Sequence, residues 1–172
     1  VEFPPLSAAA VEAALVKHWA VAPEQAQLLS RLSAGRLGWA LAVKDNEDLL
    51  HQRREKLAGL IDLAAADLEQ RFAHAAQLAS QFETDRDTVL DTLQLWLDWW
   101  RDLMLIKEGC SDWTTNIDQK ELLARRGQSY TLAQIKAAVT SITAALYQLR
   151  HNVNQRLALE VLMLDLPRAQ SR

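Results

Sequence analysis

TDRDTVLDTLQLWLDWWRDLMLIKEG, residues 84–109, is the longest stretch of this 172-residue sequence in which apolar residues recur every three or four positions. This spacing is typical of an amphipathic helix, which we expect over residues 85–108. Its polar residues form only a narrow stripe: Asp87, Asp91, Gln94, Asp98, and Arg101 or Asp102. Its apolar residues form two faces: Leu93, Trp96, Trp100 and Leu103 on one, and Val89, Leu97 and Met104 on the other. A helix with two apolar faces needs neighbours on more than one side, so the pattern predicts the centre of a helical bundle.

The same period continues through the rest of the chain, and capping residues divide it into helices. Thr84–Asp87 is a variant capping box in which Asp87 supplies the carboxylate, Thr131 is a second N-cap, and Pro167 ends the last helix. The expected helices besides 85–108 are 47–62, 64–83, 118–126, 132–151 and 155–166.

Three shorter helices precede these. The first follows the N-cap Ser7 to about His18 and turns Val11, Leu15 and Trp19 inward. The second begins at Ala22-Pro23, and the third covers 36–44. Asp45-Asn46 then breaks the pattern. The sequence therefore predicts an all-α fold, with a small three-helix unit at 1–46 and a larger bundle at 47–172; Val1–Phe3 is predicted to be the end of a strand.

Composition narrows the possible partners. Hydrophobic residues make up 49% of the chain, enough for a real core. No apolar run reaches the roughly 18 to 20 residues of a membrane span. The formal net charge is −3, and neither part is basic: residues 1–62 hold 7 basic and 8 acidic side chains, and the remainder 12 and 14. We therefore expect protein partners and no direct contact with DNA or membrane.

Residue patterns for catalysis or ligand binding are missing from the sequence. The five glycines are dispersed, so no phosphate-binding loop is present. Asp48-x-x-His51 is the nearest approach to a metal motif, but it has no second copy. The four histidines fall on different expected helices, and Cys110 has no partner for a disulfide. We expect no catalytic residue, no metal and no cofactor, and we interpret Arg53-Arg54 and Arg125-Arg126 as solvated faces paired with Glu55 and Glu121.

The junction between the second and third helices, Leu32–Leu41, reads LSAGRLGWAL. Gly35 suits the left-handed conformation that ends a helix, and Gly38 falls in the first turn of the next one, where it allows another backbone to approach closely. This pattern resembles the lid subdomain of clamp-loader ATPases of the AAA+ superfamily. Gly38 aligns with the position where active members of that family carry the sensor-2 arginine, so the resemblance is to the delta prime type of subunit, which does not hydrolyse ATP.

Two later segments are similar to the delta prime pattern. They are Arg101–Gly109 with Thr115–Asp118, and Asn152–Leu164, which looks like the final collar helix. In the latter, Asn154 is expected to cap the helix, Arg156 to pair with Glu160, and three apolar residues to face inward: Leu157, Val161 and Leu164. We expect the tryptophan face in the bundle core, with contact to another subunit as the alternative. The candidate interface residues are Trp96, Trp100, Arg101, Asn154 and Arg156.

The resemblance implies that residues 1–46 are a lid, with 1–6 the tail of an upstream ATPase domain, and that 47–172 form a collar that joins a pentameric ring. It implies gamma or tau and delta subunits as partners, an indirect link to the sliding clamp and primed DNA, and a cytoplasmic location. The family's arginine finger and zinc module would lie in the upstream domain. The fragment alone would be a monomer. A gamma or tau fragment and an unrelated helical adaptor stay open as alternatives, whereas a helical enzyme lacks the paired acids, bases or ligands that it needs.

Overall fold

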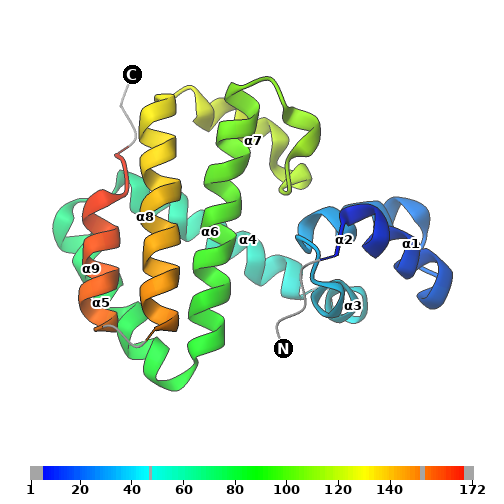
Figure 1. Ribbon diagram of the computed structural model, residues 1–172, viewed down its shortest axis with the longest axis horizontal. Helices are drawn as coiled ribbons and strands as arrows, with labels where there is room; N and C mark the ends of the chain where they lie inside the picture. Colours follow the sequence, from blue (N-terminus) through cyan, green and yellow to red (C-terminus); the bar gives the residue numbers. More distant parts are fainter. Residues whose placement is uncertain (1–5, 47, 152–153, 169–172) are drawn as a thin grey trace.

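The computed structural model describes residues 6–46, 48–151 and 154–168, and over these residues the regular structure is entirely helical, as predicted (Figure 1). The expected strand at Val1–Phe3 lies outside the described residues. The α-helices are α1 Ala8–Trp19, α2 Pro23–Leu32, α3 Leu37–Asp45, α4 Asp48–Ala65, α5 Leu68–Thr84, α6 Arg86–Lys107, α7 Lys120–Gly127, α8 Leu132–Arg150 and α9 Gln155–Asp165. Two short 3₁₀ turns, η1 Ser111–Trp113 and η2 Ile117–Gln119, connect α6 to α7.

The N-terminal helices α1–α3 enclose a core of their own. It contains Val11 and Leu15 of α1, Leu29 of α2 and Val43 of α3, and the first residues of α4 pack against it. This core is distinct from that of the bundle. The unit boundary near residue 46 remains a prediction.

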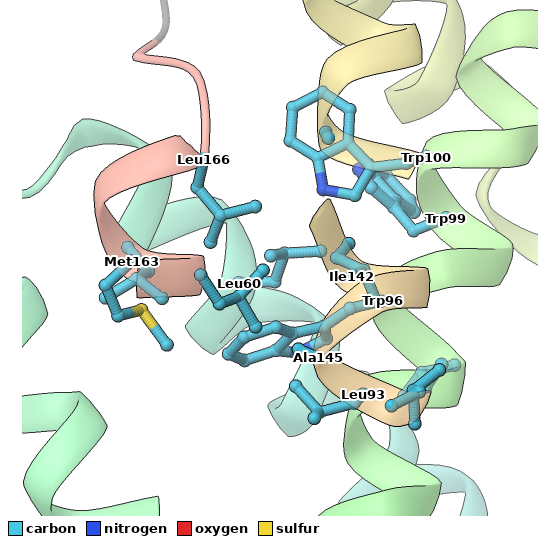
Figure 2. Packing of buried hydrophobic residues seen from close by; sticks show 14 of the residues in the cluster. Leu60, Leu93, Trp96, Trp99, Trp100, Ile142, Ala145, Met163 and Leu166 are labelled. Carbon is cyan, nitrogen blue, oxygen red and sulfur yellow. The ribbon is translucent and has the colours of Figure 1, made fainter. Parts of the chain in front are cut away.

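Helix α6 is the centre of the bundle and packs against α4, α5, α7 and α8. Its tryptophans Trp96, Trp99 and Trp100 are all buried, and Figure 2 shows them beside Leu60 of α4 and Ile142 of α8. The expectation of a tryptophan face in the core is therefore confirmed. The two apolar faces of α6 agree with its position, because it has neighbours on more than one side.

Arg71 of α5 joins the ends of two other helices. Its guanidinium donates hydrogen bonds to the carbonyls of Leu63 and Ala64 at the end of α4, at 3.1 and 3.2 Å, and to those of Met163 and Leu166 at the end of α9, at 3.0 and 2.6 Å. The last carbonyls of a helix have no partner within the helix, and the helix dipole favours a cation there. One buried arginine thus caps two helices.

The N-terminal caps of two helices differ from the prediction. α5 begins at Leu68 because Asp67 and Gln70 form a reciprocal capping box, four residues later than expected. α6 begins with Asp85 itself as N-cap, accepting from the Thr88 amide, so the proposed box ending at Asp87 is wrong. The N-caps at Ser7, Thr131 and Asn154 are confirmed.

Four apolar residues expected to point inward are exposed. Trp19 is 41% exposed at the end of α1. On α9 the exposed fractions of Leu157, Val161 and Leu164 are 55%, 44% and 53%. The inward face of α9 is instead made by Ala158, Leu159, Leu162 and Met163. α9 is apolar on both faces, so the period alone could not distinguish the buried face from the exposed one.

Candidate functional site

A cluster of buried and half-buried polar side chains joins α4, α6 and the segment between α6 and α7. We call Arg53, Asp98, Asp102, Asn116 and Asp118 the polar cluster. The side-chain oxygen of Asn116 accepts from Arg53 Nη2 at 2.6 Å, and its side-chain nitrogen donates to Asp102 Oδ2 at 2.6 Å. Asp102 also accepts a hydrogen bond from the backbone N–H of Asn116 at 2.7 Å. Asn116 therefore bridges the arginine of α4 and the carboxylate of α6.

Burial changes the proton affinities in this cluster. It raises the pKa values of Asp98 and Asp102, and hydrogen bonds from Gln94 to Asp98 and from the Asn116 amide to Asp102 act in the opposite direction. Burial lowers the pKa of Arg53, while Asp118, with Oδ1 3.8 Å from Arg53 Nη1, and the other carboxylates of the cluster support its charge. The cluster places one arginine among three aspartates, so Arg53 offsets only part of their negative charge.

The interpretation of Arg53 as part of a solvated face is thus wrong, because its side chain turns into the junction of α4 and α6 and is buried. Two members of the predicted polar stripe of α6, Asp98 and Asp102, are also buried in this cluster, whereas Asp87 and Asp91 are exposed. The sequence contained a signal for this cluster: two carboxylates at i and i+4 in the most apolar half of this helix, followed by Asn116-x-Asp118.

Asn116→Ala should lower the free energy of unfolding by about 2 to 3 kcal/mol, because it leaves Arg53 and Asp102 buried with fewer partners. Chemical denaturation measures the change. Thr115→Ala is the matched control, since Thr115 bonds to Asp102 through its backbone amide, which the substitution keeps. Equal effects of the two substitutions would contradict the bridging role of the Asn116 side chain.

A second polar contact connects the N-terminal helices to the bundle. Arg36, the N-cap residue of α3, donates to Asp91 of α6 at 3.1 Å. Beside this pair lies a cavity of about 220 Å³ between α3, α4 and α6, lined among others by Trp39, Lys56 and Leu95. Arg36 is therefore oriented toward α6 of the bundle.

Gly35 has a φ of +85°, so the left-handed conformation expected at the end of the second helix is confirmed for this residue. Gly38 lies in the first turn of α3 and is exposed. A Cβ atom added to Gly38 would meet nothing within 4 Å, so the expectation that Gly38 permits close backbone approach is wrong. What distinguishes Gly38 from an arginine at this position is therefore only that it has no side chain.

The candidate interface residues are not brought together as one patch. The side chains of Trp96 and Trp100 are each 1% exposed inside the bundle. Arg101 is exposed on α6, Asn154 caps α9 by accepting from the Leu157 amide, and Arg156 pairs with Glu160 at 2.8 Å. The burial of Trp96 and Trp100 makes them core residues, whereas a role for Arg101, Asn154 and Arg156 in contacts between subunits stays a prediction.

Burial lowers the pKa of His74, whose ring stacks on Trp96 with centroids 5.8 Å apart. His74 therefore binds a proton more tightly in the unfolded chain than in the folded chain. Neutral His74 therefore contributes its full stability at a pH above 6.5, the ordinary pKa of histidine. This contribution is lost as the pH falls through the lower pKa that His74 has in the folded chain. We expect His74→Gln to reduce the loss of stability between neutral and mildly acidic pH in denaturation curves. His18→Gln, at an exposed histidine, is the control; identical pH profiles for wild type and His74→Gln would contradict the prediction.

Within the described residues, no group of three or more His, Cys, Asp or Glu side chains is placed to hold a metal ion. The helices of these same segments include none long and apolar enough to cross a membrane.

Comparison with known families adds one match. A family model described as the C-terminal part of the DNA polymerase III delta subunit matches residues 47–168, which include the bundle and the polar cluster. No curated protein and no solved structure matches this chain.

Proposed function

The chain belongs to the family formed by the C-terminal domains of DNA polymerase III delta subunits and has a role in clamp loading; from this premise we propose that it is the lid and collar of a delta prime subunit. In this proposal residues 47–168 hold the subunit in the clamp-loader ring, in the cytoplasm, and the three N-terminal helices are the lid. The chain helps to assemble the ring and carries no catalytic site of its own.

An exposed apolar face on α5 and α9 carries this proposal. Ten large apolar side chains of the described residues are exposed, and five of them lie on these two helices: Leu68, Phe72, Leu157, Val161 and Leu164. The two helices pack against each other, and Arg71 joins the start of α5 to the end of α9. We call these five residues the α5–α9 face. Exposed apolar side chains on two helices that pack together are what a protein interface requires.

Gly38 and Arg36 support the delta prime assignment over a gamma or tau fragment. A sensor arginine acts by placing positive charge against a phosphate, and Gly38 has no side chain to do so. The neighbouring Arg36 is already paired with Asp91. An unrelated helical adaptor is disfavoured because the family match covers most of the chain.

The experiment is reconstitution of a clamp loader that lacks one subunit. The chain is added to purified gamma and delta subunits without delta prime, and separately to gamma and delta prime without delta. We expect co-elution by size-exclusion chromatography in the first mixture only. Co-elution in the second mixture only would identify a delta-type chain, and failure in both would refute the assembly role.

Variants of α9 test the surface. Leu157→Ser combined with Leu164→Ser should weaken association by about tenfold or more, since these side chains would form the apolar centre of the contact. Trp113→Ser is the matched control, because Trp113 is exposed on η1, away from α9. Equal losses from the two would show that the face is not the interface.

A further inference from the structure

A second surface, with both apolar and polar residues, lies on the other side of α8. Helix α8 stands between α9 and α6 (Figure 1), and a groove of about 730 Å³ runs between α6 and α8. Leu90 and Leu97 of α6 and Leu146 of α8 line its apolar part. This groove is separate from the α5–α9 face.

One end of the groove is basic. Arg86 at the start of α6 donates to the carbonyls of Leu149 and Arg150 at 3.0 and 3.2 Å, so the start of α6 and the end of α8 lie together. Arg86, Arg150 and His151 line that end, and among the described residues no carboxylate lines the groove. The chain as a whole has a net charge of −3, so this end differs in sign from the average surface. The complementary occupant is apolar with an acidic end.

Tyr147 provides an anchor. Its side chain is 62% exposed, and its ring stacks on His151 with centroids 4.0 Å apart. The His151 ring is held in turn by a 2.7 Å contact from Nδ1 to the Tyr147 carbonyl. A rigid exposed aromatic group loses little entropy on binding and is typical of interface hot spots.

We propose that the groove between α6 and α8 receives an amphipathic helix from a neighbouring member of the clamp-loader ring, with acidic residues of that helix beside Arg150 and His151. This inference rests on the proposed function, because a subunit within a ring uses two different surfaces for its two neighbours. The α5–α9 face serves one neighbour and the groove serves the other. A groove with a partly apolar lining and arginines at one end fits an amphipathic helix better than nucleic acid, which requires a row of phosphate contacts.

The test uses the whole chain in separate binding titrations with purified gamma and purified delta subunits. Tyr147→Ser and Arg150→Glu should each weaken one of the two complexes by about tenfold or more and leave the other within about twofold. The Leu157→Ser and Leu164→Ser double variant should show the reverse selectivity. Arg125→Glu, the same charge reversal at an exposed arginine of α7, should change neither complex.

The results of these titrations distinguish a failure of the inference from a failure of the proposed function. Wild-type chain that binds neither subunit refutes the proposed function and the inference together. Wild-type chain that binds both, with groove variants that bind both equally well, refutes the inference alone. Groove variants that lose affinity for primed DNA instead of a subunit also refute it. Circular dichroism should show native helicity for each variant; Arg150→Ala replaces Arg150→Glu if the charge reversal unfolds the end of α8.

Discussion

Arg71→Met is expected to lower the free energy of unfolding by about 3 to 5 kcal/mol. The substitution keeps the apolar stem but removes the donors to four carbonyls at the ends of α4 and α9. These carbonyls would stay buried with too few partners, and two helix ends would lose a favourable cation. Urea denaturation followed by circular dichroism measures the change.

Two controls accompany this measurement. Arg71→Lys keeps the charge but cannot span two helix ends with a planar fork, so it should recover only part of the stability. Arg54→Met removes an exposed arginine from α4 and should change stability by less than about 0.5 kcal/mol. A loss below about 1 kcal/mol for Arg71→Met would show that the double cap contributes little.

Trp100→Ala is expected to lower the free energy of unfolding by about 3 to 5 kcal/mol, because it leaves a large cavity at the centre of the bundle. The indole is 1% exposed and meets Tyr130 edge to face, with ring centroids 4.9 Å apart. This aromatic contact adds to the loss of apolar burial. The midpoint of denaturation should fall accordingly.

Trp19→Ala is the matched control for Trp100→Ala, because the same atoms are removed from an exposed position at the end of α1. It should cost less than about 1 kcal/mol. Trp100→Phe should cost less than Trp100→Ala, since the phenyl ring fills part of the cavity. A midpoint unchanged by Trp100→Ala would contradict the core position of this residue.

The periodicity of apolar residues was sufficient to predict the all-helical fold and the central position of α6. Both depend on local spacing, which the sequence contains in full. Caps with a side chain at a standard offset, such as Asn154, were predicted for the same reason. Asp67 was missed as an N-cap because the apolar run Leu63–Ala66 continues directly into it.

Contacts between residues distant in sequence could not be predicted in this way. Arg53 and Asn116 are 63 positions apart, and nothing local indicates that the arginine turns inward. The error on α9 has a related cause. Its two apolar faces have equivalent spacing, and only the positions of α5 and α8 decide which face is buried. The exposed apolar face and the basic end of the α6–α8 groove therefore required the structure.

The double cap at Arg71 also sets the order in which the bundle can form during synthesis. The α9 carbonyls that Arg71 binds come from residues more than ninety positions later in the chain. While the ribosome is still adding those residues, the guanidinium can bind only the α4 carbonyls of Leu63 and Ala64, and the α5 surface that α9 will cover stays exposed. Closure of the bundle must wait until α9 has left the ribosome, and until then this surface is available to chaperones.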